Sequence, residues 1–269
     1  MENLVIIRGG GDLATGTAYK LYQCGFRVLI LEVSSPAAIR RNVAFCEAVW
    51  QGEQTVEGVT CFCAGSEAEA VRLLEEGKLT LLVDPKGECI RRLKPMAVVD
   101  AILAKKNLGT QRDMAGITVA LGPGFEAGRD VDAVIETMRG HNLGRVIYHG
   151  EAMKNTGIPG KIGGYDRERV IYSPAAGIVR NRKQITDSVQ AGDVIAEIET
   201  EAGSVPVKTG ISGLLRGLIR DGYRVPEGFK MADVDPRIEE YENCFTISDK
   251  ARCIAGGVLE AILHLRENG

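Results

Sequence analysis

Residues 4–16 have the sequence LVIIRGGGDLATG, in which a short apolar run is followed directly by a glycine-rich turn. Gly9, Gly11 and Ala14 match the spacing of the dinucleotide-binding fingerprint, in which the backbone approaches a pyrophosphate at a helix N-terminus. Glu32 ends the next apolar run, where an acidic side chain can accept a hydrogen bond from a ribose hydroxyl. The stretch predicts a strand, a turn and a helix that bind NAD(H). The candidate cofactor-binding residues are Gly9, Gly10, Gly11, Asp12, Leu13, Ala14 and Glu32.

Asp12 departs from this pattern because it places a carboxylate in the turn that would face the pyrophosphate. A negative charge there opposes the field by which a helix N-terminus attracts anions. Two interpretations therefore stay open, a working dinucleotide site and a related fold whose glycine turn no longer holds a nucleotide.

Short apolar runs alternate with helical patterns through the first part of the chain. We expect strands at 27–31, 43–49, 79–83, 96–99, 117–121 and 145–148, and helices at 67–76 and 131–138. Runs that do not alternate with polar residues are typical of parallel strands covered on both faces. The pattern predicts a Rossmann-like α/β domain over residues 1–165. Gly122, Pro123, Gly124 and Phe125 follow one of the strands, at the ligand-binding edge of such a sheet, and join the candidate cofactor-binding residues.

From about residue 170 the chain consists of short strands and turns that repeat at an offset of 36 residues. Gly177 corresponds to Gly213, and Gly192 to Gly228. A duplicated unit of this size predicts a small β-barrel over 166–245 that resembles the biotinyl and lipoyl carrier modules. Ala202 occupies the position of the carrier lysine, so we expect neither biotin nor lipoate.

Residues 246–269 are expected to form a C-terminal helix that packs back on the α/β domain, since apolar residues recur at helical spacing from 251 to 265. Gly256 and Gly257 interrupt it. They indicate either close packing against the sheet or a backbone surface for a ligand, and we favour close packing.

A second candidate site consists of cationic residues in glycine-flanked turns. Arg139, His141 and Arg145 lie within seven residues, and Lys161 lies in the glycine-rich segment 155–164. Guanidinium groups bind phosphate in a bidentate manner, so these four residues predict an oxyanion or phosphate pocket. The alternatives are an ordinary polar connection for the first cluster and a hinge for the second.

Composition excludes several classes of protein. The 269 residues carry a net charge of −3, which does not favour nucleic acid as a partner. Neither a signal peptide nor an apolar run of membrane-spanning length is found, so we expect no membrane partner. Seven cysteines without framework spacing indicate a reducing cytoplasm. No metal is expected, because Cys61 and Cys63 have no second pair or histidine nearby.

The whole chain resembles the YqeB-type accessory proteins of the selenium-dependent molybdenum hydroxylase system. The resemblance rests on 8–16, 122–125, 139–145, 155–160, 247–252 and 257–263. It implies a role in the maturation of these hydroxylases, with a molybdopterin-type cofactor bound and selenium or cofactor inserted into a client enzyme. The N-terminal region is similar to the Rossmann part of the xanthine dehydrogenase accessory factors.

We therefore expect a cytoplasmic accessory protein, forming a homo-oligomer, that binds a small-molecule cofactor and its hydroxylase client. Two alternatives stay open, an NAD-dependent oxidoreductase of small molecules and a non-catalytic scaffold that docks the client. No catalytic residue is identified, and the sequence does not decide whether the chain is an enzyme.

Overall fold

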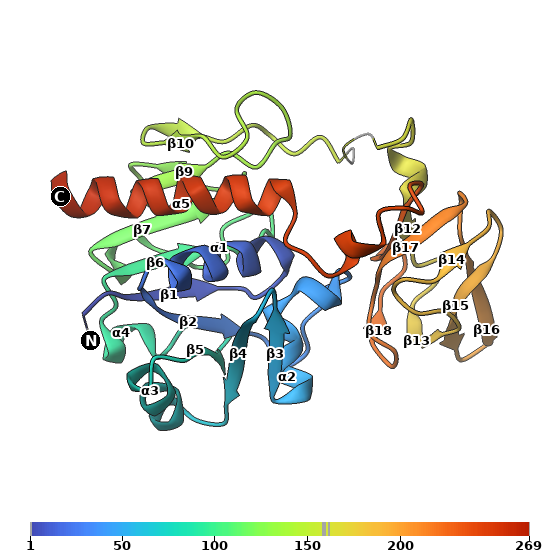
Figure 1. The fold of residues 1–269 in the computed structure, drawn as a ribbon, viewed down its shortest axis with the longest axis horizontal. Helices are drawn as coiled ribbons and strands as arrows, with labels where there is room; N and C mark the ends of the chain where they lie inside the picture. The colour runs from blue at the N-terminus through green and yellow to red at the C-terminus, as the bar shows by residue number, and fades with distance from the viewer. Residues whose placement is uncertain (1, 158–159, 161, 269) are drawn as a thin grey trace. The chain divides into compact units, whose positions relative to one another are not determined.

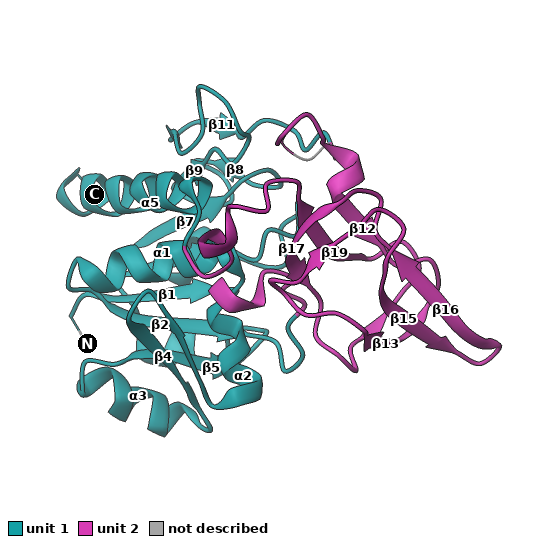
Figure 2. Ribbon diagram, turned by 45° about the vertical axis from the view of Figure 1, so that its right-hand side comes forward, with its two compact units in different colours: residues 1–36, 44–156, 247–269 teal, residues 37–43, 157–246 magenta. Residues whose placement is uncertain are grey.

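The computed structural model describes residues 2–157, 160 and 162–268, which form two compact units (Figure 2). Unit 1 comprises residues 1–36, 44–156 and 247–269, and unit 2 comprises residues 37–43 and 157–246. The chain thus enters unit 2 briefly after its second strand and leaves it before the last helix. The expected divisions were 1–165, 166–245 and 246–269.

Unit 1 is built on a nine-stranded sheet with the order β10-β9-β7-β6-β1-β2-β5-β4-β3 (Figure 1). Its strands are β1 (Leu4–Arg8), β2 (Arg27–Glu32), β3 (Glu53–Val56), β4 (Val59–Ala64), β5 (Leu79–Val83), β6 (Ala97–Asp100), β7 (Ile117–Leu121), β9 (Ala133–Ile135) and β10 (Val146–Ile147). The seven central strands are parallel, and the edge strands β3 and β10 are antiparallel to their neighbours. A separate antiparallel pair joins β8 (Glu126–Ala127) to β11 (Gly150–Glu151).

Helices cover both faces of this sheet, which explains why its strands are apolar throughout. Leu4 and Ile6 of β1 pack with Leu74 of α3 (Glu67–Glu75). Side chains in a strand alternate between faces, so Val5 and Ile7 point to the opposite face. There, α1 (Asp12–Gln23) and α5 (Asp249–Asn268) lie side by side (Figures 1 and 2). Gly16 permits this contact, since a Cβ there would lie 2.8 Å from that of Ala251.

The expected Rossmann-like fold is wrong for unit 1. The sheet contains both parallel and antiparallel strands. Strand β5 lies between β2 and β4, so β4 is nearer the edge of the sheet than β5. Several connections lack a covering α-helix of normal length: α2 (Ala48–Gln51) and α4 (Ile90–Leu93) have four residues each, and a 3-10 turn at Arg112–Met114 joins β6 to β7. The segment 131–138, expected to be helical, forms β9, and 43–49 forms 3-10 turns and the start of α2 in place of a strand.

Unit 2 consists of two four-stranded antiparallel sheets, with the orders β12-β19-β17-β14 and β16-β15-β13-β18. The strands are β12 (Val170–Tyr172), β13 (Gly177–Asn181), β14 (Ser188–Val189), β15 (Val194–Thr200), β16 (Gly203–Lys208), β17 (Gly213–Leu218), β18 (Arg224–Val225) and β19 (Lys230–Asp235). Two 3-10 turns flank them, at Arg167–Arg169 and Tyr241–Cys244. One cluster of buried aliphatic side chains fills the space between the sheets.

The structure confirms the repeat at an offset of 36 residues. Strands β13, β14 and β15 begin at 177, 188 and 194, and β17, β18 and β19 begin at 213, 224 and 230. Both halves retain one ion pair, Arg180 with Glu199 at 2.9 Å and Arg216 with Asp235 at 3.4 Å. The expected single barrel of biotinyl or lipoyl type is nevertheless wrong, since the strands pair as two separate sheets with free edges.

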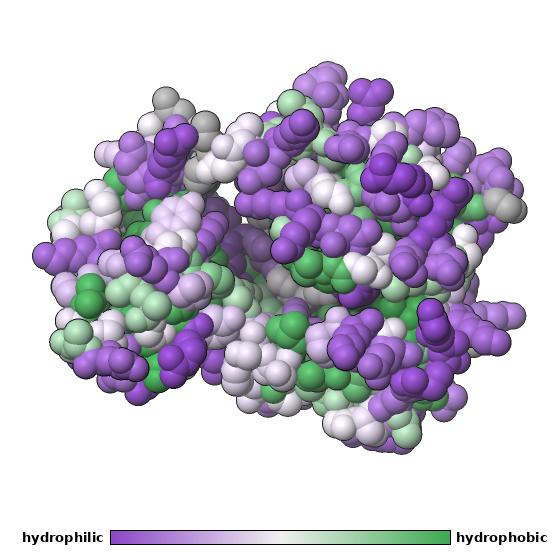
Figure 3. All heavy atoms as spheres, turned by 180° about the vertical axis from the view of Figure 1, so that it is seen from behind, coloured by the Kyte–Doolittle hydropathy of each residue, from purple (hydrophilic) through white to green (hydrophobic). Residues whose placement is uncertain are grey.

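Most of the face shown in Figure 3 is polar, with smaller apolar areas between the charged side chains. Within the described residues, no helix has both the length and the apolar composition needed to cross a membrane.

The two glycines of α5 should respond oppositely to alanine. A Cβ on Gly257 would lie 2.2 Å from the backbone oxygen of Gly144, whereas Gly256 has no atom within 4 Å of that position. We expect Gly257→Ala to lower the free energy of unfolding by about 1–3 kcal/mol through overpacking. Gly256→Ala should raise it by about 1 kcal/mol through helix propensity. Urea denaturation measures both, and equal effects of the two substitutions would contradict close packing at Gly257.

Asp235 should make unit 2 sensitive to acid. Burial raises its pKa, but hydrogen bonds from Arg237 and the charge of Arg216 outweigh burial and hold this pKa below the ordinary value of 3.8. A carboxyl group with a lowered pKa in the folded state stabilises the fold above its ordinary pKa and loses that contribution as the pH falls further. Below about pH 4, we expect the free energy of unfolding of Asp235→Asn to fall less steeply with decreasing pH than that of the parent chain. The exposed Glu239→Gln is the control, and an unchanged slope in Asp235→Asn would exclude this role.

Candidate functional site

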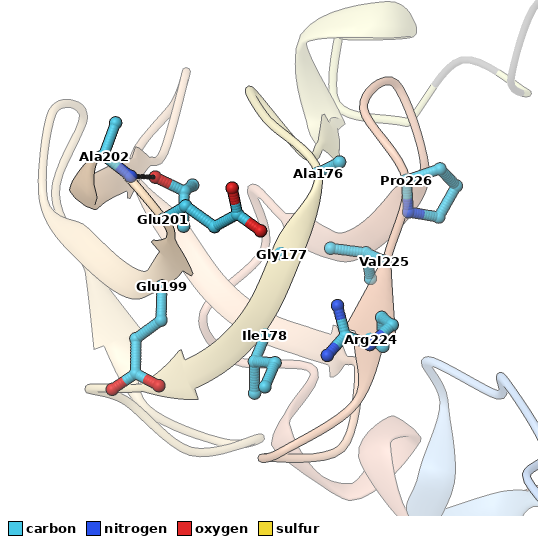
Figure 4. A pocket seen from close by; sticks show the side chains of 10 residues that line it. Ala176, Gly177, Ile178, Glu199, Glu201, Ala202, Arg224, Val225 and Pro226 are labelled. Carbon is cyan, nitrogen blue, oxygen red and sulfur yellow. Dashed lines mark hydrogen bonds between the residues drawn. The ribbon is translucent and has the colours of Figure 1, made fainter.

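A groove of about 1000 Å³ lies within unit 2, between the β15–β16 hairpin and β18 (Figure 4). Its lining combines an apolar floor with three charged side chains. The lining residues are Ala176, Gly177, Ile178, Glu199, Thr200, Glu201, Ala202, Arg224, Val225 and Pro226. The size is at the upper end of the range for small-molecule sites.

Strand pairing explains why the groove forms at this place. Strand β13 begins at Gly177, which pairs with Val225, and its next residue pairs with Glu199. The β15–β16 hairpin continues further, to the turn between Thr200 and Gly203, so it projects beyond the start of β13. A Cβ on Gly177 would lie 2.2 Å from the Glu199 backbone oxygen, so a side chain at this position would separate the two strands. Ala202 lies in the hairpin turn, where the repeat placed it.

The corresponding place in the other half of the repeat is bridged by side chains. Ser212 corresponds to Ala176, and Gln190 corresponds to Pro226, at the offset of 36 residues. The Ser212 hydroxyl donates to the Gln190 side-chain oxygen at 3.2 Å and accepts from the backbone N–H of Ala191 at 3.0 Å. Ala176 and Pro226 have no side-chain polar groups, so no such bridge can close the groove.

Two opposite charges face the groove. Glu201 projects from the hairpin and Arg224 from β18, both toward β13, which lies between them (Figure 4). Across the described residues, neither side chain has a hydrogen bond or an ion pair, whereas Glu199 is paired with Arg180. The groove can therefore bind a cationic group on one wall and an anionic group on the other, with apolar atoms of a ligand over the half-buried Ile178.

Sequence reasoning missed Glu201 and Arg224 because neither belongs to a motif. One signal was available in the repeat. The bridging residues Ser212 and Gln190 correspond to Ala176 and Pro226 in the repeat. This loss of two polar side chains marks the end of the sheet at which the groove is open.

The predicted cofactor-binding turn lies at the carboxyl ends of the parallel strands, and its glycines contact the chain itself. A Cβ on Gly9 would lie 2.9 Å from the backbone oxygen of Ala101, and one on Gly10 would lie 3.1 Å from Cys46. The Cys46 N–H donates to the Gly10 oxygen at 2.9 Å. Glu32 accepts from the N–H groups of Gly10 and Val33, each at 2.7 Å. Gly11 lacks such contacts, and Asp12, Leu13 and Ala14 start α1.

This edge of the sheet is acidic. Burial raises the pKa of the Cys46 thiol, and the negative charges of Glu32, Glu47 and Asp12 raise it further. A field of that sign is unfavourable for a pyrophosphate. The structure thus gives Gly9 and Gly10 a packing role, and binding of NAD(H) stays a prediction.

Carboxylates cap the ends of three other parallel strands in the same way. Asp84 accepts from the N–H groups of Glu88 and Cys89, Asp100 from Ile102, and Glu136 from Met138 and Met153, at 2.7–3.1 Å. Asp100 also accepts from Thr110, whose hydroxyl in turn accepts from Arg8. These side chains hold the loops that follow the strands.

The other predicted cofactor residues, Gly122 to Phe125, form a packed turn. Gly122 and Gly124 have positive φ angles of 77° and 107°, and a Cβ on either would lie within 2.6 Å of Thr137 or Lys106. Pro123 is partly buried, and Phe125 is buried in a cluster with Val131 and Val134.

The predicted oxyanion residues do not line a described pocket together. Arg139, His141 and Arg145 are exposed, and Arg139 forms a bidentate ion pair with Asp249 at 3.0 and 3.2 Å. Lys161 lies outside the described residues. Among the described residues, no three His, Cys, Asp or Glu side chains lie together in a way that could hold a metal ion.

Comparisons with known proteins add little that bears on the site. No family model matches the chain. Solved structures that share features with it include an aspartoacylase family protein from Mesorhizobium loti, with 13% identity over 86% of this chain and 84% of that one and a TM-score of 0.29. The product-bound ectoine utilization protein EutE (DoeB) from Ruegeria pomeroyi has 14% identity over 86% and 56%, with a TM-score of 0.25. A succinylglutamate desuccinylase from Silicibacter sp. has 11% identity over 86% and 84%, with a TM-score of 0.26.

These findings correct the function expected from the resemblance. Two of the named structures are an aspartoacylase family protein and a succinylglutamate desuccinylase, and none of the three supports hydroxylase maturation, an NAD-dependent oxidoreductase, or a molybdenum or selenium function. We therefore withdraw those expectations, together with the client scaffold. TM-scores below 0.3 are also too low to transfer the activity of these proteins to this chain.

One curated relative matches the chain from end to end. It is the Escherichia coli protein YqeB, uncharacterized, with 54% identity over 269 residues. The match covers all of this chain and 49% of that protein, so the chain spans about half the length of the relative. The chain is a homologue of this half of YqeB.

Proposed function

We propose that unit 2 binds a short zwitterionic peptide in the groove between the β15–β16 hairpin and β18. One observation carries the proposal: Glu201 and Arg224 face the same apolar groove from opposite walls, and neither has a partner among the described residues. The carboxylate would hold the ammonium group of the ligand, and the guanidinium would hold its carboxylate.

The composition of the groove supports this class of ligand over others. Glu199, Glu201 and Arg224 give the lining a net charge of −1, which does not suit a nucleic acid. A guanidinium fork binds a planar carboxylate through two parallel hydrogen bonds. The half-buried Ile178 on the floor would contact the side chain of a middle residue.

The volume supports a short peptide over a single amino acid. A groove of about 1000 Å³ is large for one residue, and ligands in sites of this kind have most of their surface buried. A peptide with free termini separates its two charges along the chain, so both can reach opposite walls at once.

The test is a titration of the tripeptide Ala-Leu-Ala followed by amide chemical shifts. We expect the zwitterionic form to shift resonances at Gly177, Ile178 and Val225. The form acetylated at the N-terminus and amidated at the C-terminus should bind more weakly, because both end charges are lost. Equal affinity of the free and doubly blocked peptides would contradict the proposal.

Substitutions assign each charge to its wall. Glu201→Gln and Arg224→Gln should each weaken binding of the free tripeptide roughly two- to fivefold, since exposed charge pairs contribute modestly. Glu201→Gln should not affect the peptide acetylated at its N-terminus, and Arg224→Gln should not affect the peptide amidated at its C-terminus. Glu239→Gln and Arg167→Gln, at exposed positions of unit 2 outside the groove, are the matched controls. Loss of binding in the controls would place the site elsewhere.

A further inference from the structure

A second pocket of unit 2 collects positive charge. It has a volume of about 510 Å³, and Arg41, Arg182, Lys183 and Arg220 line it together with one acidic residue, Asp221. Four positive charges and one negative charge give this lining a net charge of +3, in a chain whose net charge is −3. Such a concentration of one sign in a concave site attracts oppositely charged ligands.

The pocket lies where the two halves of the repeat meet. Gln184 and Arg220 occupy equivalent positions, 36 residues apart, and both line it. The loop after β13 and the loop after β17 therefore converge there, and each half contributes cationic residues.

Backbone contacts hold these loops in place. The N–H groups of Arg182 and Lys183 donate to the Ile195 oxygen at 2.8 and 3.1 Å. Asp221 accepts from the N–H of Asn181 at 2.7 Å, so one of its oxygens ties the two loops together. Arg41 donates through Nε to the Leu218 oxygen at 2.8 Å, which fixes its side chain beside the second loop.

Among the described residues, one donor of the pocket is left for a ligand, the ammonium group of Lys183. Arg182 is paired with Glu197 at 2.9 Å. Lys183 is half-buried, and its ammonium group has no hydrogen bond or ion pair within the described part of the chain. An anion at this position would gain favourable electrostatic energy from the positive charges of the lining.

We propose that this pocket binds a phosphate group, either as inorganic phosphate or as the phosphate of a small monoester. Guanidinium and ammonium donors around one concave site match the geometry and charge of a compact dianion. The site is separate from the peptide groove, with which it shares no lining residue. Each of the two proposals can therefore be tested without the other.

Titration of the full chain with inorganic phosphate and with methyl phosphate tests the proposal, at constant ionic strength maintained with chloride. We expect both to shift the amide resonances of residues 181–184 and 220–221. Preferential binding of methyl phosphate would identify a monoester as the ligand, and preferential binding of inorganic phosphate would identify the free anion. Absence of shifts at millimolar phosphate would overturn the proposal.

Lys183→Gln is the decisive variant, because the lost ammonium group has no structural partner among the described residues. It should weaken phosphate binding about tenfold, the loss expected for one charge-assisted contact. Lys208→Gln, an exposed lysine of β16 outside the pocket, should bind phosphate like the parent chain. Equal affinity of the two variants would overturn the assignment. Tighter binding of a single-stranded DNA oligonucleotide than of methyl phosphate would do so as well, since it would indicate a nucleic-acid surface.

Discussion

The close approach of a glycine to a carbonyl oxygen governs the structure of unit 2, and it occurs twice. A Cβ on Gly177 would lie 2.2 Å from the Glu199 oxygen, and a Cβ on Gly213 would lie 2.2 Å from the Asp235 oxygen. Any other residue would separate the strands at these points. The carboxylate of the residue that provides this oxygen also forms an ion pair across the sheet, with Arg180 in the first half and with Arg216 in the second. The close backbone contact and the ion pair therefore occur together in both halves.

The two candidate sites arise where the halves of this repeat differ in side chains. Three strands of each half begin at equivalent positions, but Ala176 and Pro226 replace the bridging pair formed by Ser212 and Gln190. That replacement leaves one end of a sheet open as a groove. The loops that meet near Arg220 become a basic pocket because most of their lining side chains are cationic. Duplication thus provided a rigid framework, and local substitutions provided two different chemical environments.

Unit 1 follows a different constraint, the need to satisfy backbone N–H groups in the loops beyond the strand ends. Glu32, Asp84, Asp100 and Glu136 each accept hydrogen bonds from such groups. A carboxylate accepts several hydrogen bonds, so it suits this task, but it also makes the edge acidic. The glycine turn expected to hold a dinucleotide lies in this environment and packs against residues 46 and 101.

Local sequence patterns determined the central strands, the last helix and the repeat, because each depends on periodicity within a short window. The segment 131–138 was misjudged because its helical pattern did not show that residues 133–135 would pair with β7. Strand order also escaped prediction, since β5 lies beside β2 through contacts distant in the chain. Tertiary structure alone brought Glu201 and Arg224 to one groove. Their charges are ordinary in sequence, and they become a site only because the backbone around Gly177 places them on opposite walls of one groove.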